Sequence, residues 1–162
     1  MSEAAVLEVD LPDEAATAAL AHRLAPALRA GGVVYLHGEL GAGKTSFARA
    51  LLRALGANER IKSPTYSLIE SYRFGGIVAH HLDLYRIADP GELEFLGLDA
   101  LAEPSGLVLV EWPERGAGAL PPPDWRLDLA HAGTGRRARL SALSAPAREA
   151  LRNLQPPRTN RA

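Results

Sequence analysis

Hydrophobic and polar positions along the chain predict strands and helices in alternation. Short apolar or alternating runs are typical of strands, and apolar positions three to four residues apart are typical of helices. The first third of the chain predicts a strand, a helix, a buried strand and a second helix: Ala5–Val9, a helix with Asp13 as N-cap that runs to about Arg29, Gly32–His37, and Ser46–Leu55. Gly31 and Gly32 are expected to end the first helix, and Pro26 to kink it.

The middle of the chain predicts a hairpin, a short helix and another buried strand. Gly75-Gly76 is a favourable two-residue turn between the strands Tyr66–Phe74 and Ile77–Tyr85. Pro90 favours a helix start, with a short helix over Gly91–Leu96. Leu107–Val110 is a continuous apolar run, as expected for a strand buried on both faces of a parallel sheet.

The last third predicts two alternating strands, Trp125–Leu129 and Arg137–Leu143, after the stiff connector Pro121–Pro123. The predicted fold class is α/β: a single domain over residues 1–145, with a mixed, mostly parallel sheet and helices on both faces. Residues 146–162 are expected to form a polar C-terminal helix or tail, with disorder at its end.

Composition narrows the function classes only slightly. The 162 residues carry a formal net charge of −1, which gives no reason to expect non-specific nucleic-acid binding, and there is no cysteine for a disulfide or a thiolate metal site. Met1–Asp10 has no basic residue, so it does not resemble a secretory signal, and no apolar run reaches the length of a membrane span. We expect a cytoplasmic protein without a membrane partner.

The strongest chemical signal is the segment Gly38–Thr45, which fits the phosphate-loop pattern G-x-x-x-x-G-K-[ST] between a predicted strand and a predicted helix. Glycines let the backbone turn its N–H groups toward phosphate oxygens, and the helix N-terminus adds partial positive charge. The alternative is a glycine turn that only caps a helix. The context favours binding of a nucleoside triphosphate, with these candidate contacts: Gly38, Gly41, Ala42, Gly43, Lys44, Thr45 and Ser46. The predicted fold is accordingly that of a P-loop NTPase.

Acidic residues at strand ends decide what happens to the γ-phosphate. Glu111 directly follows the strand Leu107–Val110, as the acid of a Walker B element does. It could hold magnesium together with Thr45, or orient an attacking water; alternatively it is a solvated charge. Asp83 reaches the same region if its strand lies beside the phosphate loop, and otherwise could pair with Arg86 on the surface. The candidate catalytic residues are therefore Asp83, Glu111 and Lys44, and the candidate metal ligands are Thr45 and Glu111.

The loop Ser63-Pro64-Thr65 is a candidate switch loop that senses the γ-phosphate. Taken alone, it is better interpreted as an ordinary turn that leads into a strand.

Four motifs together carry a family resemblance: the phosphate loop Gly38–Thr45, Ser63-Pro64-Thr65-Tyr66, His81-Leu82-Asp83-Leu84-Tyr85-Arg86, and Glu111-Trp112-Pro113-Glu114. In order and spacing they resemble the TsaE (YjeE) family, the P-loop ATPases of bacterial tRNA threonylcarbamoyladenosine biosynthesis. The resemblance extends from about Val9 to Leu143. The phosphate loop is generic, whereas the H-x-D-L-Y-R segment followed by a strand that ends in Glu-Trp is specific.

The resemblance implies a magnesium-dependent ATPase, with ATP and Mg²⁺ as cofactors, that acts with TsaB and TsaD. That pair forms the transferase core that modifies adenosine 37 of tRNA. The resemblance therefore implies that this protein contacts tRNA only indirectly, through the complex. It further implies that Lys44 binds the phosphates, that Thr45 and Glu111 bind magnesium, and that Asp83 takes part in hydrolysis or positions the metal. Ser63–Tyr66 would be the switch loop, and Trp112 would pack near the nucleotide or a partner.

Several alternatives stay open. No residue is an obvious arginine finger, although Arg86 is a candidate, so we expect weak activity in isolation and stronger activity with partners. A small-molecule kinase or a non-catalytic ATP-dependent assembly module would share the loop. The late arginines Arg136, Arg137, Arg139 and Arg148 could contact tRNA, but a solvated face is the better interpretation. The sequence does not decide whether Asp83 or Glu111 positions the attacking water.

Overall fold

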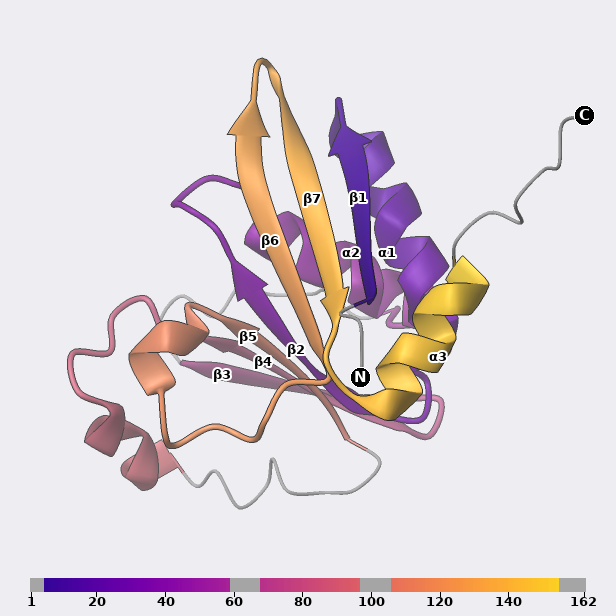
Figure 1. The fold of residues 1–162 in the computed structure, drawn as a ribbon. Helices are drawn as coiled ribbons and strands as arrows, with labels where there is room; N and C mark the ends of the chain where they lie inside the picture. Colours follow the sequence, from indigo (N-terminus) through magenta and orange to yellow (C-terminus); the bar gives the residue numbers. More distant parts are fainter. Residues whose placement is uncertain (1–4, 59–67, 97–105, 155–162) are drawn as a thin grey trace, which may run out of the picture.

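The protein is built on one twisted seven-stranded sheet with the strand order β1-β7-β6-β2-β5-β4-β3 (Figure 1). The computed structural model describes residues 5–58, 68–96 and 106–154. The strands are β1 (Ala5–Leu11), β2 (Gly32–His37), β3 (Ile69–Phe74), β4 (Ile77–Asp83), β5 (Leu107–Glu111), β6 (Trp125–Ala132) and β7 (Gly135–Ala142). The helices are α1 (Glu14–Leu28), α2 (Lys44–Leu55) and α3 (Ala145–Leu154), with 3₁₀ helices η1 (Pro90–Leu96) and η3 (Pro113–Gly116).

The four central strands, β6, β2, β5 and β4, run parallel to one another. The outer pairs are antiparallel: β3 with β4, and β7 with both β6 and β1. The expected α/β fold with a mixed sheet is confirmed, and half of the six strand pairs are parallel. The predicted hairpin is present, with Phe74 opposite Ile77 across the Gly75-Gly76 turn, and the two predicted late strands pair as a second hairpin, with Ala132 opposite Gly135 at the end of β6 and β7.

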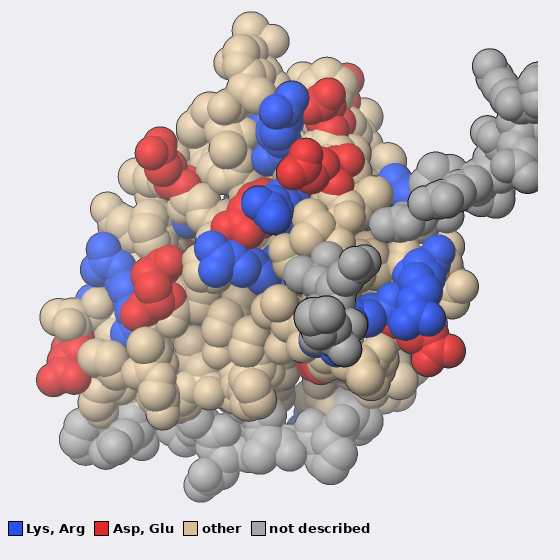
Figure 2. Space-filling model, in the orientation of Figure 1, with Lys and Arg blue, Asp and Glu red and all other residues tan. Residues whose placement is uncertain are grey.

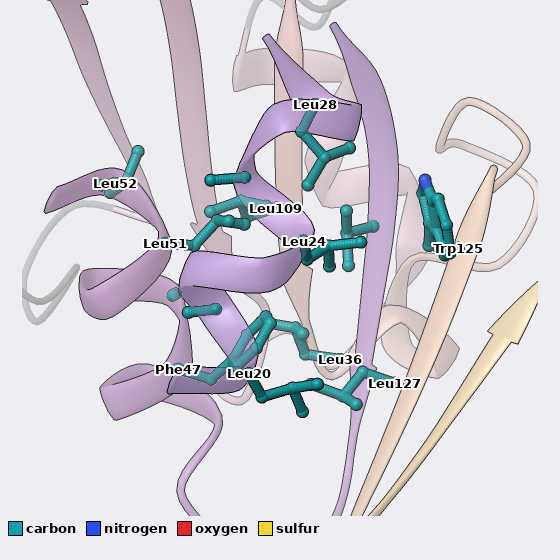
Figure 3. Close-up of a cluster of buried hydrophobic side chains, with 14 of the residues drawn as sticks. Leu20, Leu24, Leu28, Leu36, Phe47, Leu51, Leu52, Leu109, Trp125 and Leu127 are labelled. Atoms are coloured by element: carbon teal, nitrogen blue, oxygen red, sulfur yellow. The ribbon is translucent and has the colours of Figure 1, made fainter. Parts of the chain in front are cut away.

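The main hydrophobic core lies between the sheet and the α-helices. Its side chains from α1 and α2 meet those of the central strands, as Figure 3 shows for Leu24, Phe47, Leu51, Leu109 and Trp125. In α1 the buried positions recur every three to four residues, which is why this segment folds as an amphipathic helix. A smaller core with Leu82, Val108 and Val110 covers the opposite face of the sheet together with Leu93 of η1. Among the described residues, all three α-helices therefore pack into one core.

The ends of several elements differ from the expected ones. β1 continues to Leu11, two residues beyond the predicted end, because Leu11 is buried in the main core. The predicted helix after Pro90 is a 3₁₀ helix. The expected division at residue 145 falls on the first residue of α3, which buries Ala147 and Leu151 in the same core as α1. The start of the strand predicted from Tyr66 lies outside the described residues.

Local chemistry at the helix ends explains where the helices begin and end. Asp13 caps α1 as expected, since its carboxylate accepts a hydrogen bond from Ala16 N at 2.9 Å. Pro26 lies inside α1, and the glycine Gly56 ends α2 in a left-handed conformation. At the other end of α2, by contrast, the N-cap is Gly43, and no side chain caps the first free N–H groups. These N–H groups therefore remain available to a ligand.

No helix in the described part of the chain is both long enough and apolar enough to span a membrane.

Candidate nucleotide-binding site

The loop between β2 and α2 has the backbone of an anion-binding cradle. Gly38, Gly41 and Gly43 all have positive φ angles, of 153°, 80° and 103°. A Cβ atom at Gly38 would lie 2.6 Å from the carbonyl oxygen of Leu129, whereas none of the atoms around Gly41 or Gly43 lies within 4 Å of such an atom. Gly38 is thus required by close packing against β6, and the other two by the turn itself.

Lys44 is held at the start of α2 with its charge almost buried. Its side chain is 5% exposed, and its Nζ atom donates to the carbonyl oxygen of Gly38. The same Nζ lies 3.5 Å from the centre of the Trp112 ring, in a cation–π contact. Burial lowers the pKa of Lys44, while Glu111 nearby favours its charged form. The lysine is therefore a cation held by weak partners, which suits it to exchange them for a phosphate.

Glu111 and Thr45 are in direct contact. The Thr45 hydroxyl donates to both carboxylate oxygens, at 2.8 Å to Oε1 and 3.0 Å to Oε2. Glu111 ends β5 and is only 2% exposed, so it is not a solvated charge at a strand end. Carboxylate and hydroxyl oxygens are ligands that magnesium accepts. The two candidate metal ligands thus form one pair of oxygen donors beside the phosphate loop.

Asp83 lies at the same edge of the sheet, directly opposite Glu111 in the pairing of β4 with β5. Its Oδ1 atom accepts a hydrogen bond from Tyr85 N at 3.1 Å. Burial raises the pKa of Asp83 above its ordinary value, and the negative charge of Glu111 raises it further. The register therefore brings the two acids together, as parallel strands that end at one edge should.

A cavity of about 240 Å³ joins these residues, and we call it the phosphate-side pocket. Its lining comprises Leu40, Gly41, Gly43, Lys44, Thr45, Ser46, Asp83, Tyr85, Glu111 and Trp112. All three candidate catalytic residues therefore face one space. Ser63, Pro64 and Thr65, the predicted switch loop, lie outside the described residues.

Trp112 lies over this pocket in a constrained conformation. It follows β5 with φ 57° and ψ 51°, and it is the only described residue other than glycine with a positive φ. Its ring lies 5.1 Å from that of Tyr85, and the Arg115 guanidinium lies 5.6 Å from its centre. Arg115 could not be assigned to the site from the local pattern, because only the turn at Trp112 and the 3₁₀ helix η3 bring it there.

His81 is the buried residue that sequence analysis did not assign. It has no exposed surface, and its Nε2 atom lies 2.6 Å from Glu111 Oε2. It stands two residues before Asp83 on β4, so both side chains lie on the same face of the sheet. That spacing was the available signal, but a buried strand also accepts histidine as ordinary core packing.

Arg136 also contacts the phosphate loop, whereas the sequence favours a solvated face for this arginine. Its guanidinium donates to Gly41 O at 3.1 Å and to its neighbour Gly135 O at 2.9 Å. It belongs to a second cavity, of about 290 Å³, which we call the hairpin-side pocket. The lining of that pocket is Leu11, Pro12, Asp13, Glu14, Thr17, Gly41, Gly43, Ser46, Thr134, Gly135 and Arg136. The two pockets share the phosphate loop as their common wall.

Other late arginines have different surroundings. Arg137 pairs with exposed Asp10 across β7 and β1, with 3.2 Å between Nε and Oδ1, and Arg148 donates to Leu143 O at 3.3 Å. Figure 2 shows acidic and basic side chains interspersed on the face that it displays. This mixture agrees with the net charge of −1.

A comparison with protein families identifies the family. The profile of the family described as threonylcarbamoyl adenosine biosynthesis protein TsaE matches residues 11–139. The chain belongs to the TsaE family. The match begins in β1 and ends in β7, so it contains every candidate site residue and confirms the resemblance inferred from the motifs.

Individual TsaE relatives agree with this assignment. The tRNA threonylcarbamoyladenosine biosynthesis protein TsaE of Haemophilus influenzae is 43% identical over 110 residues, which cover 68% of this chain and 70% of that protein. The protein of the same name from Bacillus subtilis is 36% identical over 126 residues, with 78% and 77% covered. Among solved structures, Bacillus subtilis YdiB superposes with a TM-score of 0.76 at 26% identity, covering 95% of this chain and 97% of that one.

Proposed function

We propose that the protein binds and hydrolyses magnesium-ATP as a subunit required for threonylcarbamoylation of adenosine 37 in tRNA. The observation that carries this proposal is the convergence of Lys44, Thr45, Asp83 and Glu111 on one pocket at the uncapped N-terminus of α2. Membership of the TsaE family gives the pathway. The geometry supports the nucleotide chemistry independently, because each group is one that phosphoryl transfer uses.

The two pockets suggest how the nucleotide lies. Since the lysine of a phosphate loop reaches the β- and γ-phosphates, the terminal phosphate belongs in the phosphate-side pocket. The α-phosphate then faces the N–H groups at the start of α2, and the ribose and base extend toward the hairpin-side pocket. There Arg136 contacts the loop, because its guanidinium donates to Gly41 O. The choice of adenine over guanine rests on the family assignment.

The residues fit a magnesium ion at Thr45 and Glu111. Their oxygens already touch, at 2.8 Å and 3.0 Å, and Asp83 lies opposite Glu111 in the next strand. A bound magnesium ion would neutralise charge on the phosphate oxygens. Lys44 would add positive charge to the same oxygens, while Glu111 or Asp83 would orient a water in line with the terminal phosphate.

Partners are needed to complete this site. The phosphate-side pocket is open at its rim, where Leu40 is 68% exposed and Tyr85 42% exposed. Arg115 lies over the Tyr85 ring at 5.3 Å, but neither it nor Arg86 donates a hydrogen bond to any group of the pocket within the described ranges. We therefore propose that the TsaB–TsaD pair docks near this rim and orders the site for hydrolysis.

The direct test of nucleotide binding is calorimetry of the isolated protein with ATP and GTP, each in Mg²⁺ and in EDTA. The proposal predicts one ATP per chain, tighter binding in Mg²⁺ and weaker binding of GTP. In a separate assay of hydrolysis, inorganic phosphate should be released from ATP when no acceptor molecule is present. No ATP binding under either condition would overturn the proposal.

A further inference from the structure

The Glu111 carboxylate is buried, and its hydrogen bonds come from only two side chains among the described residues. One is the Thr45 hydroxyl, which faces both oxygens, and the other is His81 Nε2 at 2.6 Å from Oε2. An ionised carboxylate only accepts hydrogen bonds, so the proton of this short contact lies on His81 Nε2. A carboxylate that is 2% exposed needs such donors, because burial of an unpaired charge is costly.

The two donors differ in where they lie, because only Thr45 lines the phosphate-side pocket. In the proposed function Thr45 would hold the metal through a lone pair of its hydroxyl oxygen, while its O–H could still donate to Glu111. His81 lies on β4 and is not among the residues that line the phosphate-side pocket. It therefore contacts Glu111 without being a candidate ligand of the metal.

His81 is also unusual as a core residue. It is fully buried, yet its Nδ1 atom has no hydrogen-bond partner in the described part of the chain. A histidine that only fills the core usually has both ring nitrogens satisfied. The hydrogen bond to Glu111 thus accounts for an imidazole at this position.

We propose that His81 is the positioning residue for Glu111: its imidazole N–H fixes Oε2 and so keeps Oε1 directed toward Thr45, where the metal would be held. This inference rests on the proposed function, because it assigns His81 to the magnesium site. Outer partners of metal ligands fix the orientation of those ligands, and their loss typically reduces metal affinity about 10- to 100-fold.

His80 offers a matched control on the same strand. It is also buried, but it lies on the opposite face of the sheet, where its Nδ1 is 2.8 Å from Ser71 Oγ. Replacing either histidine by leucine removes one buried imidazole from β4. Only the replacement of His81 removes a donor from Glu111.

The experiment measures ATP affinity by calorimetry in EDTA and over a range of Mg²⁺ concentrations, for the unsubstituted chain, His81→Leu, His81→Gln and His80→Leu. We expect His81→Leu to bind ATP normally in EDTA but to need about 10- to 100-fold more Mg²⁺ for the tighter binding. His81→Gln should recover most of this loss, since its amide N–H can take the place of Nε2–H. His80→Leu should match the unsubstituted chain in its Mg²⁺ requirement.

The outcomes separate the two proposals. If His81→Leu responds to Mg²⁺ like the unsubstituted chain, or if His80→Leu loses the response equally, the positioning role is wrong while the proposed function stands. If the unsubstituted chain binds ATP without any effect of Mg²⁺, the proposed metal site fails and the role of His81 fails with it. Should His81→Leu not fold, His81→Gln is compared with His81→Asn, whose amide lies nearer the position of Nδ1. Equal Mg²⁺ requirements in these two variants would also overturn the inference.

Discussion

At the scale of single residues, Lys44 is the clearest example of a group prepared for a ligand. Its buried ammonium is held by the Gly38 carbonyl and the Trp112 ring, and no ion pair between described residues includes it. Both present contacts are weaker than a bond to an anionic phosphate oxygen. These two contacts therefore keep the charge in place without neutralising it.

Substitution Lys44→Ala should weaken ATP binding. It removes a charge-assisted contact worth about 1.5–3 kcal/mol, which corresponds to a rise in Kd of roughly 10- to 150-fold. Calorimetry with ATP in Mg²⁺ checks this. An unchanged Kd would mean that Lys44 does not contact the phosphates.

Substitution Glu111→Gln should separate binding from hydrolysis. Glutamine keeps the size of the side chain but loses the charge, so ATP should still bind while phosphate release slows by about 100-fold or more. Single-turnover phosphate release by the assembled complex is the measurement. Turnover at the unsubstituted rate would transfer the role of positioning water to Asp83.

The raised pKa of Asp83 has a consequence for stability. Burial disfavours its charged form, so this group stabilises the fold below its ordinary pKa of 3.8, and the contribution is lost as pH rises through the higher folded-state pKa. At pH 7 the charged Asp83 is thus a cost to folding. Asp83→Asn should raise the free energy of unfolding at pH 7, measured without Mg²⁺ or nucleotide, and this gain should shrink near pH 4. A variant less stable than the unsubstituted chain at pH 7 would contradict the assignment of burial as the dominant cause.

At the scale of elements, the strand–loop–helix unit of β2 and α2 was predictable and the polar network behind it was not. The glycine spacing and the apolar strand before it define the phosphate loop in one continuous segment. The contact of His81 with Glu111, by contrast, depends on the parallel register of β4 with β5, which connects residues 30 positions apart. Local patterning does not encode that register.

The hairpin of β6 and β7 gives a second example. Its two strands and their pairing follow from alternation, but the approach of Arg136 to Gly41 depends on how the sheet twists beside the loop. The sequence predicts α3 only as a polar helix or tail. In the structure two of its residues, Ala147 and Leu151, are buried. So few buried side chains leave the packing of an element undetermined until the core is known.

The loop itself makes a testable prediction at this scale. Gly38→Ala should destabilise the protein more than Gly41→Ala, because its Cβ would meet the Leu129 carbonyl oxygen at 2.6 Å while that of Gly41 meets open space. Both variants carry the strain of a positive φ, at about 1–2 kcal/mol, and the clash adds about 1–3 kcal/mol at Gly38. Urea unfolding of the two variants compares them directly. Equal losses would show that the approach of β6 to the loop is not rigid.

At the scale of the whole molecule, one twisted sheet carries a site at the carboxyl edge of its parallel strands. β2 leads into the phosphate loop, β4 ends in Asp83 and β5 ends in Glu111, so the fold alone places the three groups together. The pocket that they line is open at its rim. An open site of this kind agrees with the proposal that a partner surface completes it.

The central claim is that the protein is an ATPase whose site is completed by its partners. Phosphate release from magnesium-ATP, measured with and without a TsaB–TsaD pair from the same organism, tests this claim most directly. We predict slow release by the isolated protein and clear stimulation by the pair. Release at the same rate in both cases would contradict the account.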